Sequence, residues 1–199
     1  IGRITGPPWV DGSPCPISPK ATSIRHPKRE GPLSHLSITS WNIHRGRGED
    51  SVVDPARTTD VLCREVVSRP TDLLILQEAD AETPPHAGIL DLSDIEARSG
   101  LAHVHRSKTD RWGEKSHGFH GVIFLAGPGI RVEDLALIDL PGQCHRGAVI
   151  ADVAGRDGHP FRVVGTHLAL SQLLRIVQMR TIGQHLARRR PRPTILCGD

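Results

Sequence analysis

The sequence predicts an α/β domain, because an apolar strand, a helix and a second apolar strand follow one another early in the chain. Residues 36–43 have the pattern of a strand, and Asp54 followed by Pro55 is typical of a capped helix start. Pro70 ends this helix, and the apolar run at residues 72–79 predicts the next strand. Such a unit predicts two parallel, adjacent strands joined by a right-handed crossover.

Weaker patterns in the middle of the chain predict a helix and two short strands, at residues 91–98, 101–106 and 121–126. Two further strands are expected at residues 146–154 and 159–168. The segment between them begins and ends with glycine, at Gly155 and Gly158, which is typical of a hairpin turn.

The clearest amphipathic helix is expected at residues 171–189. Its apolar face is predicted to consist of Leu173, Leu174, Val177, Ile182 and Leu186. The last seven residues of the sequence, PTILCGD, predict a buried strand that ends with Asp199.

The first 35 residues differ in composition from the rest. They hold seven of the sixteen prolines and show no apolar periodicity, which is typical of a disordered or loosely attached leader. A peripheral hairpin tied to the domain is the alternative. Residues 36–199 are expected to form one domain, with enough chain for a sizeable core.

The composition narrows the classes of function. A net charge of +3 permits a nucleic-acid partner without arguing for one, and three Trp, three Phe and no Tyr offer few platforms for stacked bases. No apolar run is as long as a membrane span, so no transmembrane segment is expected. The four cysteines form no C-x-x-C pair and the histidines no H-E-x-x-H motif, which argues against a zinc site.

Four of the predicted strands end in a polar side chain that can bind a metal ion or a phosphate group. These side chains are Asn42, Glu78, His167 and Asp199. Because Asn42 and Glu78 follow neighbouring parallel strands, both are expected at the carboxyl edge of one sheet, where ligand sites of α/β proteins collect.

The segments WNI, LQE, THL and GD that contain these residues, in this order, resemble the endonuclease/exonuclease/phosphatase superfamily, which includes deoxyribonuclease I. The resemblance covers residues 36–199. It implies a two-sheet α/β sandwich of the deoxyribonuclease I-like type, with helices outside. The family's F-N and S-D-H segments would come after Asp199, so the resemblance also implies a domain that is truncated, or incomplete at its carboxyl terminus.

The resemblance implies a divalent metal ion held mainly by Glu78, with Mg²⁺ expected and Mn²⁺ as the alternative. It places Asn42 beside the metal, where the amide would either offer its carbonyl to the ion or orient a neighbouring carboxylate. Without the resemblance, Glu78 would be an exposed residue at a strand end. Asn42 would then be the cap of a turn into the Gly-rich HRGRG segment.

The resemblance also implies catalytic roles for two further residues. His167 is expected to contact the scissile phosphate and to stabilise the transition state. Asp199 is expected to position or deprotonate the attacking water, or to support the metal. Asn42 completes this catalytic set.

Two residues are candidates for binding the substrate phosphate. Arg146 begins a predicted strand, and its guanidinium fits phosphate oxygens, although a solvated strand end is an equal alternative. His120 stands in HGFHGVIFLA, where many members of the family have G-N-A, and is the second candidate substrate contact.

The predicted function is therefore divalent-metal-dependent hydrolysis of phosphoester bonds, by a phosphodiesterase or nuclease rather than a phosphomonoesterase. The alternative is a catalytically incompetent fragment or remnant that at most binds metal or phosphate. The substrate, and hence the partner, is expected to be a nucleic acid, a phospholipid headgroup or an inositol phosphate. We expect a cytoplasmic monomer, with secretion left open because the amino terminus can be processed.

Overall fold

The computed structural model describes residues 35–67, 70–142 and 144–199. The chain divides into two units, Ile1–Leu33 and Ser34–Asp199. The predicted leader at residues 1–35 lies outside the described residues except for His35.

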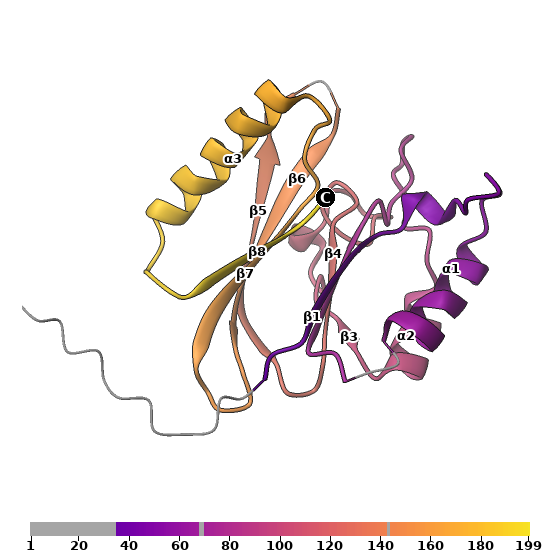
Figure 1. Ribbon diagram of the computed structural model, residues 1–199, viewed down its shortest axis with the longest axis horizontal. Coiled ribbons are helices and arrows are strands. Elements are labelled where there is room, and N and C mark those ends of the chain that lie inside the picture. The colour runs from indigo at the N-terminus through magenta and orange to yellow at the C-terminus, as the bar shows by residue number, and fades with distance from the viewer. Residues whose placement is uncertain (1–34, 68–69, 143) are drawn as a thin grey trace, which may run out of the picture. The chain divides into compact units, whose positions relative to one another are not determined.

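Within the described residues, eight strands form two four-stranded sheets (Figure 1). The first sheet has the order β1-β2-β4-β3, with β1 at Ile38–Asn42, β2 at Leu73–Gln77, β4 at Ile123–Ala126 and β3 at Ala102–His103. The second sheet has the order β5-β6-β7-β8, with β5 at Arg131–Leu140, β6 at Arg146–Ala154, β7 at Pro160–Thr166 and β8 at Thr194–Gly198. The expected two-sheet α/β architecture is confirmed.

The strand–helix–strand unit at the start of the domain is also confirmed. Strands β1 and β2 pair in parallel, and Asn42 lies opposite Gln77. Between them, α1 (Pro55–Val61) continues into the π-helical segment η2 (Leu62–Val66). The Asp54 carboxylate caps α1 by accepting the backbone N–H of Arg57 at 3.0 Å, which satisfies one of the free donors of the first turn.

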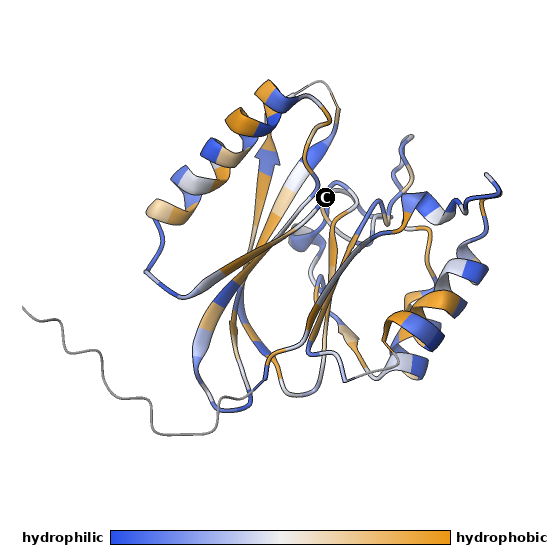
Figure 2. Ribbon diagram, in the orientation of Figure 1, coloured by the Kyte–Doolittle hydropathy of each residue, from blue (hydrophilic) through white to orange (hydrophobic). Residues whose placement is uncertain are grey.

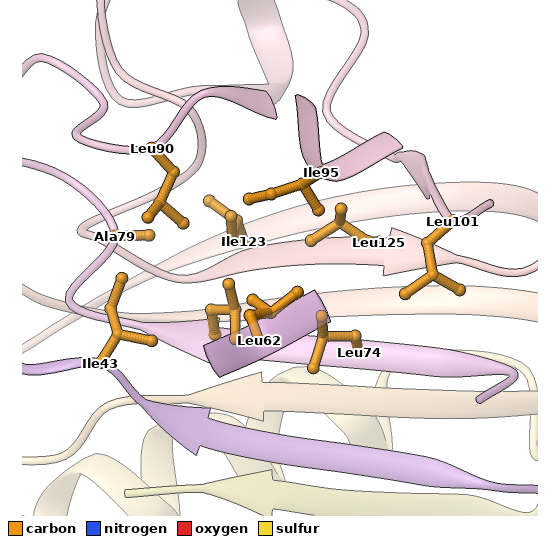
Figure 3. Packing of buried hydrophobic residues seen from close by; sticks show 10 residues of the cluster. Ile43, Leu62, Leu74, Ala79, Leu90, Ile95, Leu101, Ile123 and Leu125 are labelled. Carbon is orange, nitrogen blue, oxygen red and sulfur yellow. The ribbon is translucent and has the colours of Figure 1, made fainter. Parts of the chain in front are cut away.

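Three apolar clusters hold the layers together. One lies between the first sheet and the segments η2 and α2 (Leu92–Ser99), and Figure 3 shows Leu74, Ile95 and Leu125 in it. The second joins the inner faces of the two sheets, and the third packs the outer face of the second sheet against α3 (Gln172–Ala187). Figure 2 shows the apolar residues that run along the strands.

The two sheets approach closely at Gly165 in β7. A Cβ atom at this position would lie 2.6 Å from Phe124 and 2.8 Å from Ile75, both on the first sheet. These distances are too short for a side chain, so glycine permits the close contact. The contact brings the carboxyl ends of β7 and β2 toward one another.

The prediction from the sequence missed one strand and made another too long. Strand β5 was not predicted because its residues are largely half-exposed and a register shift between Val132 and Asp134 interrupts its pairing with β6. Strand β3 has two residues rather than the expected 101–106. The hairpin of β6 and β7 and the strand at β4 are confirmed.

The predicted apolar face of α3 was wrong in part. Leu173 and Val177 are 78% and 48% exposed, whereas Ile182 is buried. Gln178 takes the central buried position instead: it accepts the N–H of Ala169 and donates to the carbonyl of Pro141. A glutamine whose amide oxygen and nitrogen both have hydrogen-bond partners can be buried, so a different face of this helix lies toward the sheet.

The final strand was correctly expected, but it is not buried. Strand β8 pairs in parallel with β7 and forms the edge of the second sheet. Ile195 and Leu196 on this strand are 38% and 42% exposed. Among the described residues, no helix combines the length and the apolar character needed to cross a membrane.

Candidate metal and phosphate site

The four polar residues singled out in the sequence lie at four neighbouring strand ends. Asn42 ends β1 and Glu78 follows β2, while His167 follows β7 and Asp199 follows β8. Strand β8 of the second sheet lies against β1 and β2 of the first. Figure 1 shows the carboxyl terminus beside the end of β1. Both sheets therefore deliver side chains to one place.

Asn42 links the two sheets directly. Its Nδ2 donates to Glu78 Oε1 at 3.1 Å and to Asp199 Oδ2 at 2.7 Å. Its Oδ1 accepts the backbone N–H of His44 at 2.9 Å, which orients the amide. Asn42 thus caps the turn after β1 and also orients two carboxylates, so the two interpretations of this residue are compatible.

Glu78 is the half-buried carboxylate at the centre of the site. It follows a strand with five fully buried residues, and its own backbone has φ of 59°, in the left-handed region. The next residue, Ala79, donates its N–H to the carbonyl of Gly121 at 2.9 Å. A non-glycine residue held at positive φ is strained, and such strain is common where a side chain must point into a site.

His167 is buried beside this carboxylate. Its Nε2 lies 3.6 Å from Glu78 Oε1, and its backbone N–H donates to the carbonyl of Gly147 at 3.2 Å. Burial lowers the pKa of His167, and the nearby Arg146 lowers it further, against the opposite effect of Glu78 and Asp199. The imidazole is therefore mainly neutral near pH 7.

Asp199 is held through its backbone. Its N–H donates to the carbonyl of Thr166 at 3.1 Å, and its carbonyl accepts the N–H of Leu168 at 2.7 Å. These bonds continue the pairing of β8 with β7 by one residue. The exposed carboxylate is directed toward Asn42 by the hydrogen bond described above.

The two candidate phosphate contacts lie next to this group. Arg146 begins β6, and its Nε donates to the carbonyl of Leu168, directly after His167. His120 is buried in the turn before β4, and its Nε2 lies 3.1 Å from Asp139 Oδ1. A Cβ at Gly147 would meet the His120 ring at 2.9 Å, so both candidates lie at the start of β6.

One charged residue of the site was missed in the sequence. Arg45 Nη1 lies 2.8 Å from Glu78 Oε2, and the Nε of the same guanidinium is buried without a hydrogen-bond partner. Arg45 also has φ of 50°, between His44 at 48° and Gly46 at 76°. The signal for it was the HRG segment after Asn42, which indicates a turn but not the direction of the Arg45 side chain.

The donor groups at this site fit a hard divalent cation. Glu78 and Asp199 supply carboxylate oxygens, and Asn42 holds both carboxylates in place. Across residues 35–67, 70–142 and 144–199, no three His, Cys, Asp or Glu side chains converge as a complete metal cage. Mg²⁺ is commonly bound by one or two carboxylates and keeps several waters, so this donor set suits Mg²⁺ better than zinc.

Comparisons with known proteins relate the chain to solved structures only. No protein-family model matches the sequence, and no curated protein matches it. TDP2 from D. rerio, in complex with a single-stranded DNA product, is 21% identical with a TM-score of 0.60, over 82% of this chain and 60% of that one. The chain spans less than two thirds of the length of TDP2.

Two further structures have the same architecture. An endonuclease/exonuclease/phosphatase from Beutenbergia cavernae is 22% identical with a TM-score of 0.54, over 82% of this chain and 47% of that one. ANGEL2, a 2′,3′-cyclic phosphatase, is 12% identical with a TM-score of 0.53, over 82% of this chain and 52% of that one. The chain therefore has the fold that these structures share, the deoxyribonuclease I-like fold that its motifs predict.

Proposed function

We propose that this protein hydrolyses phosphoester bonds with the help of a divalent metal ion, Mg²⁺ or Mn²⁺, and that its substrates are phosphodiesters. The observation that carries the proposal is the hydrogen-bonded set Glu78–Asn42–Asp199 with His167 beside it. Side chains separated by up to 157 positions in the chain meet there. A structural role for one strand-end residue would not require the other three.

Two carboxylates and one amide make up the metal-binding part of the site in this proposal. Glu78 and Asp199 would hold the ion, which when bound would neutralise charge on a phosphoryl oxygen. Asn42 fixes the spacing of the two carboxylates, because its amide bonds to both. Asp199 is exposed and can accept a proton from a water molecule that approaches the phosphorus.

The neutral His167 ring and Arg146 complete the phosphate site. A neutral imidazole next to Glu78 can donate an N–H to a phosphoryl oxygen, and the donor gains strength as charge develops in the transition state. Arg146 lies next to His167 through its bond to Leu168 and adds a positive charge. We propose that these two residues bind the non-bridging oxygens of the phosphoryl group.

The solved structures support phosphodiesters as the substrate class. One neighbour, TDP2, contains a single-stranded DNA product, and another, ANGEL2, is a 2′,3′-cyclic phosphatase, whose substrate class is itself a phosphodiester. We therefore favour phosphodiesterase or nuclease activity over hydrolysis of phosphomonoesters. We also infer a monomer that acts in the cytoplasm.

The proposal is tested by measuring hydrolysis with the full-length protein. Bis-p-nitrophenyl phosphate, plasmid DNA, sphingomyelin and inositol phosphates are offered with Mg²⁺, Mn²⁺ or EDTA. We expect metal-dependent cleavage of a phosphodiester. We also expect Glu78→Gln to lower kcat by roughly 10²- to 10³-fold, as is typical when a group that stabilises transition-state charge is lost.

The matched control is Glu82→Gln. It removes the same charge, also near Arg45, which lies 3.9 Å from Glu82, but the Glu82 side chain is 77% exposed. We expect activity within about twofold of the unchanged protein, as for surface changes outside a site. Metal-dependent turnover that survives Glu78→Gln would contradict the proposed function. Metal binding without any hydrolysis would favour the non-catalytic alternative.

A further inference from the structure

Four ring side chains gather beside the candidate site. We call His86, Trp112, His120 and His145 the ring cluster. His86 stacks on Trp112 with ring centroids 3.6 Å apart, and Trp112 lies 4.3 Å from His120 and 4.5 Å from His145. The planes of His120 and His145 are within 11° of parallel, with centroids 5.6 Å apart. One of the three Trp residues and three of the twelve His residues of the sequence meet there.

The ring cluster is continuous with the phosphate site. His145 directly precedes Arg146, and His120 directly precedes Gly121. A Cβ at Gly121 would lie 3.2 Å from the Cα of Glu78. Gly121 thus lies against the backbone of Glu78. His120 is the neighbour of Gly121 in the chain, and its Cα atom is about 3.8 Å from that of Gly121. A ligand whose phosphate lies at Glu78 can therefore reach the rings.

The ring cluster extends from the interior to the surface. His120 is buried, Trp112 and His86 are half-buried, and His145 is exposed. The Nδ1 of His120 is buried without a hydrogen-bond partner, although its Nε2 is near Asp139. His145, Trp112 and His86 are therefore the rings that a ligand can reach from the surface, while His120 forms the buried end of the cluster.

Metal binding does not explain the ring cluster. Its rings stack face to face or at a tilt. In the described part of the chain, no three His, Cys, Asp or Glu side chains come together in a way that could hold a metal ion. Stacked rings instead suit a flat, polarisable partner. Bases stack on aromatic side chains whatever their sequence, because every base has a π-face.

We propose that the ring cluster binds the nucleobase of a phosphodiester substrate while its phosphate occupies the site at Glu78. The inference rests on the proposed function and narrows its substrate class to nucleotides. The ring of the base stacks on the exposed His145 and on the half-buried Trp112. Lipid headgroups and inositol phosphates lack a flat aromatic ring that could stack in this way.

A binding experiment without metal tests the ring cluster independently of catalysis. Titration calorimetry in EDTA compares adenosine 5′-monophosphate with ribose 5-phosphate, which has the same phosphate but no base. We expect the nucleotide to bind about tenfold more tightly, the size typical of one stacked base. Trp112→Leu should abolish this difference and leave the affinity for ribose 5-phosphate unchanged.

A second variant guards against misfolding, because Trp112 also contacts its neighbours in the loop. His145 is exposed, so His145→Ala should leave the melting temperature unchanged and reduce the preference for the nucleotide by roughly threefold. His185→Ala, on the exposed part of α3, is the control and should leave both affinities unchanged.

An activity experiment completes the test. A short DNA strand is compared with the same strand carrying a base-free tetrahydrofuran next to the cleaved phosphate. We expect kcat/KM to fall about tenfold without the base in the unchanged protein, and to be equal for both strands in Trp112→Leu. Equal binding of nucleotide and ribose phosphate by the unchanged protein would overturn the inference. Base-dependent binding without any hydrolysis would instead uphold it and refute the proposed function.

Discussion

The two sheets support the candidate site in different ways. In the first sheet, β2 lies between two apolar clusters and its five residues are all buried before Glu78. In the second sheet, β8 is an edge strand with mostly exposed residues before Asp199. One carboxylate thus follows the most buried strand, and the other follows one of the most exposed.

The difference shows how the site can be ordered without a large shared core around it. Glu78 is fixed by the packing of β2, whereas Asp199 depends on two backbone hydrogen bonds, to Thr166 and Leu168. The Asn42 amide then aligns the second carboxylate with the first. Changes in the first sheet should therefore affect the stability of the domain more than changes at β8.

The largest effect is expected from Phe124→Ala. Phe124 is fully buried between the sheets, and its loss should lower the free energy of unfolding by about 3–5 kcal/mol. Leu196→Ala on β8 should cost less than about 1 kcal/mol, because Leu196 is 42% exposed. Urea unfolding of both variants measures the difference. Equal losses would show that β8 is as important to the core as the first sheet.

The second sheet also relies on a buried ion pair. Arg162 Nε donates to Asp152 at 2.6 Å, and the Arg162 side chain is only 2% exposed. Burial raises the pKa of Asp152, but the hydrogen bond and charge of Arg162 outweigh this and hold the pKa below its usual value. Asp152→Ala should cost about 3 kcal/mol, because Arg162 is left buried without its partner.

Asp134→Ala is the matched control for this pair. Asp134 binds Arg189 at 2.9 Å, but its side chain is 58% exposed, so the expected loss is below about 1 kcal/mol. Thermal and urea unfolding measure both variants. If Asp152→Ala were as mild as the control, the ion pair would contribute little to the second sheet.

A smaller effect is expected from pH, and it arises in the first sheet. His105 Nδ1 is 2.7 Å from the carbonyl of Asp110, and its Nε2 accepts the N–H of Phe124. Burial lowers the pKa of His105 to about 4 and that of the neighbouring His103 to about 4. Both rings are therefore neutral in the folded protein, with Nδ1 of His105 carrying the proton.

The lowered pKa values determine whether the protein gains or loses stability as the pH falls. The unfolded chain takes up protons near pH 6.5, while the folded protein resists them until about pH 4. The stability contributed by each neutral ring is complete above pH 6.5 and is lost as the pH falls toward 4. His105→Gln should flatten this part of the pH–stability curve, and His185→Gln should not. An unchanged slope in His105→Gln would contradict the assignment.

Local signals explain which parts of the fold were predictable. The Asp54–Pro55 cap and the apolar run before Glu78 depend on neighbouring residues, so the pairing of β1 with β2 followed from them. The face of α3 that is exposed could not be predicted from local signals. Only the folded structure shows that Gln178 finds hydrogen-bond partners at Ala169 and Pro141.

The same contrast applies to the site. The resemblance singled out Asn42, Glu78, His167 and Asp199, and the structure brings them together. It could not indicate that Arg45 reaches Glu78, since a turn with three successive positive φ values determines the direction of that side chain. Nor could it indicate that His86 and His145 meet Trp112, because those contacts join segments far apart in the chain.

The central claim is that both sheets contribute to one metal site, and the most direct test is Mn²⁺ binding measured by electron paramagnetic resonance. We predict one bound ion, with an affinity that falls roughly 100-fold in Glu78→Gln and roughly tenfold in Asp199→Asn, a range typical even for the loss of groups that only support metal ligands. Glu82→Gln should bind as the unchanged protein does. Unaltered Mn²⁺ affinity in Glu78→Gln or in Asp199→Asn would contradict a site shared by the two sheets.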